Sequence, residues 1–118
     1  MEYLVQVLHQ NQDLERLAMQ HNRLADADLT QLASAIESHR SLSYLDVSAN
    51  KIGNQEFVKL FHAVSRSQIS TFHFRKNRIG GNKIDHVLFC RSQNLRVLNL
   101  TQNRLSVQNG TSLLKYAR

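Results

Sequence analysis

Residues 42–52 read L-S-Y-L-D-V-S-A-N-K-I, and this pattern of apolar positions followed by one asparagine occurs four times in the chain. Written as L-x-x-L-x-V-x-x-N-x-I, the other copies begin at Leu14, Ile69 and Leu95. The pattern asparagines are Asn22, Asn50, Asn77 and Asn103. They are spaced by 28, 27 and 26 residues. A pattern recurring at nearly constant spacing in one register indicates a repeat architecture.

The alternation inside residues 42–52 predicts a short strand with one buried face. Leu45 and Val47 alternate with more polar residues, so a strand would bury these two and expose their neighbours. An asparagine suits the bend that follows, because its amide can pair backbone donors and acceptors left free where the chain leaves the strand. Stacked copies would set the four asparagines in a column.

Helical periodicity follows the bends, since apolar residues recur there at steps of three and four. Asp26 or Asp28 is expected to cap one helix, and Gly53 with Asn54 to start the next. The expected strands lie near 16–20, 44–48, 71–75 and 97–101. The expected helices lie near 27–39, 54–66, 82–91 and 109–116, after an amphipathic N-terminal helix over residues 2–10. Strand, helix and strand in succession predict a parallel sheet.

In these features the chain resembles the leucine-rich repeat family, specifically its intracellular, helix-containing subtype typified by ribonuclease inhibitor. The resemblance covers about residues 14–118 and implies an α/β fold, a right-handed, curved solenoid with parallel strands on the concave face and helices on the convex face. We expect one domain over residues 1–118. Its parts are an N-terminal helix or cap (1–13), three repeats (14–41, 42–68 and 69–94) and an incomplete C-terminal repeat (95–118).

Composition favours a reducing, intracellular setting. The chain has 118 residues, 42% of them hydrophobic, which is enough for one core. No apolar run approaches the roughly 18 residues that span a bilayer, and the N-terminus lacks the pattern of a secretory signal. Cys90 is the only cysteine, so the chain has no internal disulfide. We expect a cytoplasmic protein, or one delivered into a host cytosol if it is a bacterial effector. Because one helix precedes the first strand and the last repeat is incomplete, we expect either a segment of a longer protein or self-association through the solenoid ends.

Charge is divided unevenly along the chain. The formal net charge is +6. Residues 1–59 contain five basic and eight acidic residues, whereas residues 60–118 contain ten basic residues and one acid, Asp85. A basic half of this kind either points to an acidic partner or only keeps an exposed solenoid soluble.

Candidate chemistry is sparse. The six histidines form no grouping with the spacing of metal ligands, and they are interpreted as solvated or loop residues. His86 and Cys90 lie four apart on one expected helix, but Cys90 fits better as a small apolar residue that ends the buried stripe. The Gly80-Gly81-Asn82-Lys83 stretch lacks the spacing of a phosphate-binding loop. We therefore expect no enzyme activity, no cofactor and no metal site.

A binding surface is expected on the concave face and beside it. A basic residue follows each pattern asparagine, and two more basic residues, Arg75 and Lys76, enlarge this column in the third repeat. We define the basic ridge as Arg75, Lys76, Arg78 and Arg104. Tyr44 is the expected anchor, because it offers a large rigid ring and a hydroxyl. The full set of expected partner-binding residues is Tyr44, Asp46, His73, Arg75, Lys76, Arg78, Asn99 and Arg104.

The leading hypothesis is a non-enzymatic protein-interaction module, either a bacterial effector or part of a larger intracellular protein, with an acidic protein partner. One alternative is a GTPase activator or other regulatory leucine-rich repeat protein, which a GTP hydrolysis assay would identify. Another is a binder of an anionic polymer such as nucleic acid, whose affinity would depend steeply on salt. Nucleic acid is disfavoured because aromatic residues do not interleave with the basic ones. No membrane partner is expected.

Overall fold

The computed structural model describes residues 2–81, 84 and 94–105. The helices are α1 (Glu2–Gln10), α2 (Asp26–Ser38) and α3 (Asn54–Ser65). The strands are β1 (Arg16–Ala18), β2 (Tyr44–Asp46), β3 (Thr71–His73) and β4 (Val97–Asn99). Apart from Ile84, the helices predicted near 82–91 and 109–116 lie outside the described residues.

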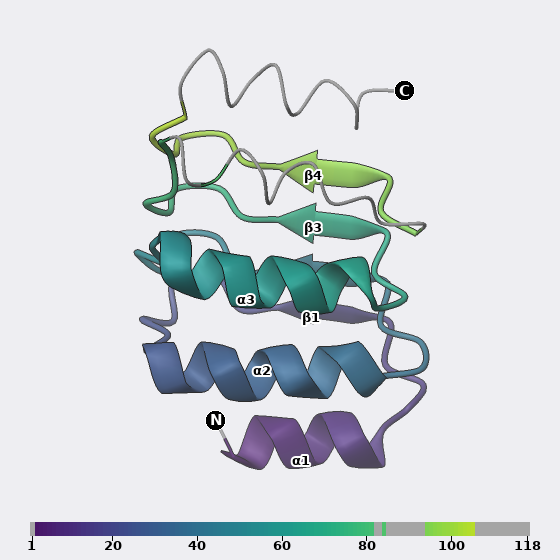
Figure 1. Ribbon diagram of the computed structural model, residues 1–118. Coiled ribbons are helices and arrows are strands. Elements are labelled where there is room, and N and C mark those ends of the chain that lie inside the picture. The colour runs from purple at the N-terminus through teal and green to yellow at the C-terminus, as the bar shows by residue number, and fades with distance from the viewer. Residues whose placement is uncertain (1, 82–83, 85–93, 106–118) are drawn as a thin grey trace.

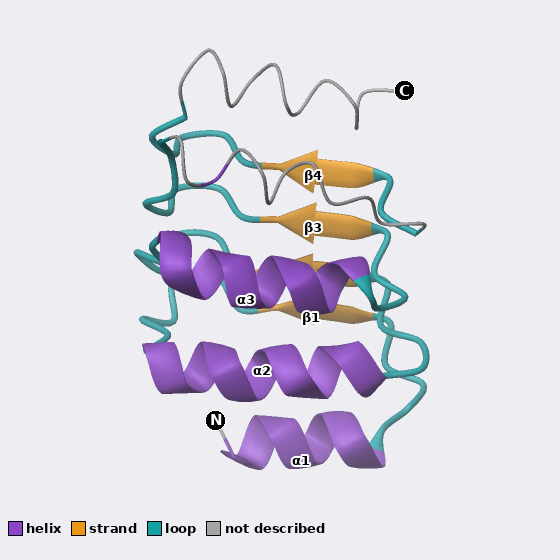
Figure 2. Ribbon diagram, viewed as in Figure 1, coloured by secondary structure: helices purple, strands orange, loops and turns teal. Residues whose placement is uncertain are grey.

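The strands form one parallel sheet in the order β1-β2-β3-β4. Tyr44 of β2 lies opposite Arg16 of β1 and Thr71 of β3, and Thr71 lies opposite Val97 of β4. Corresponding repeat positions therefore stand side by side across the sheet. Figures 1 and 2 show the strands stacked in one layer and α1, α2 and α3 in a second layer against it. The predicted fold class is confirmed, and we call the sheet surface turned away from the helices the concave face.

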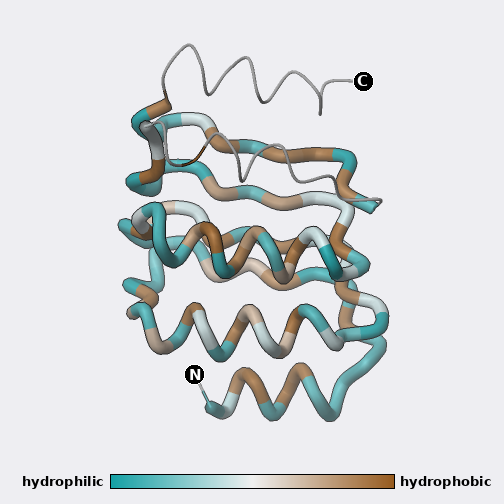
Figure 3. Tube along the Cα trace, viewed as in Figure 1, coloured by the Kyte–Doolittle hydropathy of each residue, from teal (hydrophilic) through white to brown (hydrophobic). Residues whose placement is uncertain are grey.

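Apolar side chains from both layers meet between them. Hydrophobic and hydrophilic segments alternate along helices and strands (Figure 3), as expected where each element has one buried side. Leu45 is fully buried, as the alternation predicted. The rings of Phe57 in α3 and Phe74 after β3 lie 4.8 Å apart between centroids, and Phe61 and Phe72 extend this cluster. Each such side chain contributes about 1.5–3 kcal/mol by leaving water.

The asparagine column is a hydrogen-bonded ladder. The side-chain oxygen of Asn50 accepts from the N–H groups of Asn22 (2.9 Å) and Leu24 (3.3 Å) in the preceding repeat. The oxygen of Asn77 accepts in the same way from Asn50 (3.1 Å) and Ile52 (2.9 Å). Each of the two amide groups also donates to a carbonyl of the preceding repeat. These side chains take up backbone groups that the bends leave unpaired, as the sequence predicted.

The regular strands are three residues long, shorter than the predicted five-residue spans. The chain turns out of extended geometry just before each asparagine, where His21, Ala49, Lys76 and Gln102 have φ values of 60°, 58°, 53° and 59°. Interstrand bonding still reaches this point, because Ala49 N–H donates to the Arg75 carbonyl at 2.8 Å. A left-handed conformation costs a non-glycine residue about 1–2 kcal/mol. At the second, third and fourth bends, the several hydrogen bonds of Asn50, Asn77 and Asn103 help to offset that cost.

His39 lies in the loop after α2, in agreement with the interpretation of the histidines as solvated or loop residues, but it is buried, with 4% of its surface exposed. Its Nδ1 accepts from the N–H groups of Ser41 (3.3 Å) and Leu42 (3.0 Å). Its Nε2 lies 2.9 Å from the carbonyl of Asn11, and since a carbonyl only accepts, Nε2 carries the proton. His39 thus connects the end of α2 to the turn after α1.

The helix starts agree with the predicted caps in part. Asp28 accepts a hydrogen bond from the N–H of Ala25 at 2.9 Å, so Asp28 rather than Asp26 supports the start of α2. Asn54 begins α3 but does not cap it. Its side chain instead exchanges two hydrogen bonds with the backbone of Gly80, at 2.8 and 3.0 Å. Asn54 therefore joins neighbouring repeats, which a single repeat viewed alone does not reveal.

Candidate functional site

The outward side chains of the strands form rows across the concave face. The first row contains Arg16, Tyr44, Thr71 and Val97. The second row contains Ala18, Asp46, His73 and Asn99. One residue from each strand enters each row because corresponding positions are paired in register. The third row, just past the strands, includes Ser48 and Arg75.

Tyr44 is held between two side chains from the neighbouring strands. The guanidinium carbon of Arg16 lies over its ring, 3.9 Å from the centroid. On the other neighbouring strand, the His73 ring lies 5.3 Å from the Tyr44 ring at an interplanar angle of 55°. Contacts of these two kinds contribute about 0.5–1.5 kcal/mol each. They favour this orientation of the tyrosine before any partner arrives.

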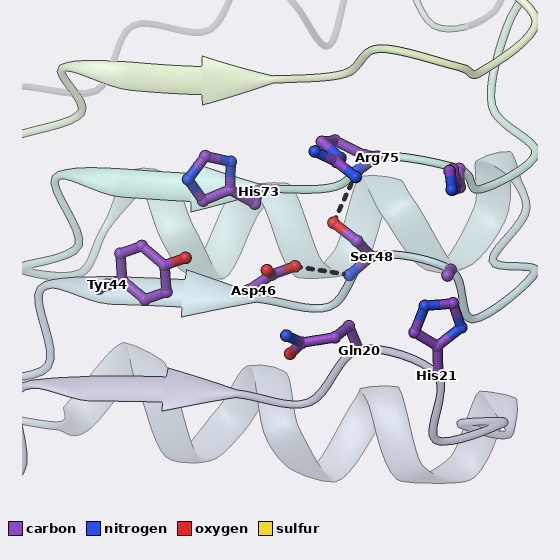
Figure 4. Close-up of a pocket in the computed structure, with 9 residues that line it drawn as sticks. Gln20, His21, Tyr44, Asp46, Ser48, His73 and Arg75 are labelled. Atoms are coloured by element: carbon purple, nitrogen blue, oxygen red, sulfur yellow. Dashed lines mark hydrogen bonds between the residues drawn. The ribbon is translucent and has the colours of Figure 1, made fainter.

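A hollow of about 410 Å³ opens on the concave face beside Tyr44. Figure 4 shows its labelled side chains projecting from three neighbouring repeats toward the same space. It is lined by Gln20, His21, Tyr44, Asp46, Ser48, Ala49, His73, Arg75 and Lys76. The structure therefore brings together five of the eight residues expected to bind a partner.

Hydrogen bonds fix the floor of this hollow. Asp46 accepts from the Ser48 N–H at 2.9 Å through one carboxylate oxygen. The Ser48 hydroxyl oxygen accepts from the Arg75 N–H at 2.9 Å (Figure 4). Ser48 is 6% exposed, whereas Arg75 and Lys76 are exposed at the rim. The floor is therefore rigid, and the charged rim is open to solvent.

The corresponding positions of the fourth repeat are arranged differently. Both the N–H (3.1 Å) and the hydroxyl (2.8 Å) of Thr101 donate to the side-chain oxygen of Asn99. Asn99, one of the expected binding residues, thus uses its oxygen within its own bend. Val97 stands where the second repeat has Tyr44, and it is 45% exposed.

Arg78 and Arg104 complete the basic ridge outside the hollow. Arg78 N–H donates to the Ile52 carbonyl and Arg104 N–H to the Ile79 carbonyl, both at 2.8 Å. The first bond joins the third bend to the second, and the second bond joins the fourth bend to the third. Gly80 packs directly on the Arg104 bend, and an added Cβ would lie 1.9 Å from the Arg104 carbonyl oxygen. The two exposed arginines therefore have backbone positions fixed relative to each other.

Among the described residues, one ion pair is present, between Arg66 and Glu37 at 3.6 Å on the helix side. Over the same residues, no histidine, cysteine, aspartate and glutamate side chains gather as a metal site. No helix in the described part is long and apolar enough to cross a membrane. His86 and Cys90 lie outside this part of the chain. Sequence reasoning missed His21 as a lining residue, although its place directly before a pattern asparagine could have identified it.

Two comparisons with known proteins agree with this architecture. A family model described as Leucine Rich repeat matches residues 38–55 and 91–108. The matched segments are therefore leucine-rich repeats, of the subtype whose repeats contain a helix.

Its fold is similar to a solved structure of the tropomodulin C-terminal domain from Caenorhabditis elegans, with a TM-score of 0.82. The two are 13% identical, and the match covers 98% of this chain and 74% of that one. At this identity the likeness concerns the fold alone. No curated protein sequence matches the chain.

Proposed function

We propose that this chain is a non-enzymatic protein-interaction module that binds a partner protein through its concave face and the basic ridge. Leucine-rich repeat domains generally bind proteins. The fold alone names no partner, so the proposal depends on the site.

The observation that carries the proposal is Tyr44, which lies beside the hollow in contact with Arg16 and His73. A large side chain already restricted by Arg16 and His73 loses little freedom on binding, which lowers the entropic cost of association. Tyrosine also combines apolar area with a hydroxyl, and such residues supply much of the energy at protein interfaces. Tyr44 is therefore the proposed anchor.

The other residues have supporting roles in this proposal. Asp46 and His73 flank the anchor, and Arg75 and Lys76 form the charged rim. Arg78 and Arg104 extend the surface along the bends, where their charges assist association more than they lengthen the life of the complex. Asn99 contributes at the margin through its amide nitrogen, since its oxygen is used by Thr101.

Selection from an unbiased library of displayed peptides tests this function. Ligands selected on the wild-type chain should bind the Tyr44→Ala variant at least about tenfold more weakly, as expected for an interface hot spot. Val97→Ala is the matched control, because Val97 holds the same repeat position on β4. Its effect should stay within about twofold, as for a contact outside the energetic centre of an interface. Selected peptides that bind the Tyr44→Ala variant as tightly as the wild-type chain would contradict the proposal. A library that yields no binding peptide would contradict it as well.

A further inference from the structure

Building on the proposed function, we propose that the hollow beside Tyr44 binds a carboxylate side chain from an extended, acidic segment of the partner protein. Arg75 and Lys76 would hold the carboxylate from the rim, and the Ser48 hydroxyl would donate to it from the floor. The inference follows from unpaired charge, from an unused hydroxyl donor and from the shape of the hollow.

The charge argument starts from Arg75 and Lys76. Both are exposed and adjacent in the chain, and within the described residues neither forms an ion pair. Arg78 continues the positive surface on the same bend. Neighbouring like charges repel one another, and an anion placed between them relieves that repulsion and is drawn in by the field. Charge-assisted hydrogen bonds from a guanidinium or ammonium to a carboxylate are also stronger than neutral ones.

The second argument is the difference between Ser48 and Thr101. The Thr101 hydroxyl donates to Asn99, so its proton has an acceptor within its own repeat. The Ser48 hydroxyl oxygen instead accepts from the Arg75 N–H, and no described residue accepts its proton. Buried hydroxyl groups normally donate as well as accept. A carboxylate oxygen in the hollow would complete the hydrogen bonds of Ser48.

The third argument concerns size and backbone. A volume of about 410 Å³ accommodates one or two side chains and is too small for a folded element. In an extended segment, side chains two apart lie about 6.6 Å from one another on the same side. A second acidic residue could then reach the basic ridge while the first occupies the hollow. The second carboxylate oxygen of Asp46 accepts no hydrogen bond from a described residue, and it can accept from a backbone N–H of such a segment.

These features favour protein over nucleic acid. Single-stranded nucleic acids bind largely by stacking bases on exposed aromatic faces. Tyr44 is already contacted by Arg16 and His73 from the two neighbouring strands. Asp46 also lines the hollow, and its carboxylate can accept from a peptide N–H, a donor that a phosphate backbone lacks.

The probe for this inference is a fluorescent octaglutamate peptide, with octaglutamine and an oligothymidylate of equal charge as comparisons. Fluorescence anisotropy measures the affinity of each probe. At about 0.1 M salt, protein charges farther than about 10 Å from the bound probe are largely screened and contribute little. Octaglutamate should bind the wild-type chain more tightly than either comparison does. Arg75→Glu/Lys76→Glu should weaken binding by about tenfold or more, as expected for reversing two contact charges.

Matched variants separate the site from net charge. Lys59→Glu/Arg66→Glu changes the net charge by the same amount but alters exposed residues of α3 and its C-terminus, so its effect should stay within about twofold. Ser48→Ala should weaken binding about threefold or more, and Ser48→Thr, which keeps the hydroxyl, should restore most of it. Thermal unfolding of each variant verifies that it is folded under the assay conditions.

Equal weakening by the two double variants, or tighter binding of the oligothymidylate, would overturn the inference. The proposed function can survive that result. If selected peptides depend on Tyr44 but are not acidic, and octaglutamate does not compete with them, the interaction module stands and the acidic ligand is wrong.

Discussion

The second and fourth repeats place similar residues at the same positions of the concave face but use them differently. In the fourth repeat, Asn99 and Thr101 bond to each other, and their strand carries a small valine in the first row. In the second repeat, the Ser48 N–H bonds to Asp46 in the same way, but the Ser48 hydroxyl accepts from Arg75 of the next repeat, and a hollow opens beside Tyr44. A repeat position is therefore not a fixed role. The side chain supports the bend where its hydroxyl donates within its own repeat, as in Thr101. It can bind a ligand where no described residue accepts its hydroxyl proton, as in Ser48.

The largest expected effect comes from removing the core that supports both repeats. Leu45→Asp would bury an unpaired charge at a fully buried position, at a cost of about 3–5 kcal/mol or more. Domains of this kind have a total stability of about 5–15 kcal/mol. Chemical denaturation followed by circular dichroism should show a variant that is unfolded or severely destabilised. An unchanged unfolding midpoint would mean that the strand register is wrong.

A smaller effect is expected from the ladder that keeps the repeats in register. Asn77→Ala removes a buried side chain with four backbone hydrogen bonds and should cost about 2–4 kcal/mol. Asn22→Ala is the control, because Asn22 is exposed and its side chain bonds only to Gln20 among the described residues. Its cost should be under about 1 kcal/mol. Equal losses in the two variants would show that the ladder does not join repeats.

The close approach of the third and fourth bends depends on Gly80. Gly80→Ala would place a Cβ against the Arg104 carbonyl and should cost about 1–3 kcal/mol as the bends separate. Gly53→Ala is a control with open space around the new atom, and about 0.5 kcal/mol is expected there. Denaturant titrations compare the two variants directly. If the two variants lose the same free energy of unfolding, close packing of the bends is not the reason that position 80 requires a glycine.

The positions that could be predicted from the sequence are those whose role repeats. Leu45 and Asn77 are buried as the pattern indicated, because every repeat needs a core residue and a bend residue at fixed offsets. His39 could not be predicted in this way, since its carbonyl partner, Asn11, lies 28 residues away in a turn without a repeat signature. The hollow depends on side-chain hydrogen bonds between repeats. The alternation in the sequence shows that Ser48 faces outward. It does not show whether the Ser48 hydroxyl bonds within its own bend or to Arg75 of the next repeat.

The smallest stability effect should distinguish the two concave-face pairs. Asn99→Ala removes the acceptor of both Thr101 bonds and should cost about 1 kcal/mol, with less than about a twofold change in octaglutamate affinity. A large loss of affinity in this variant, with the fold intact, would extend the binding site to β4 and remove the distinction between the repeats.

The most direct test is a titration of isotope-labelled protein with octaglutamate, followed by backbone amide NMR shifts. The account predicts that the largest shifts fall on Tyr44, Ser48, Arg75 and Lys76. The amides of Asn99 and Thr101 and those of α3 should change little. Shifts that are largest at Asn99 and Thr101, or spread evenly over all basic residues, would contradict a carboxylate site in the hollow.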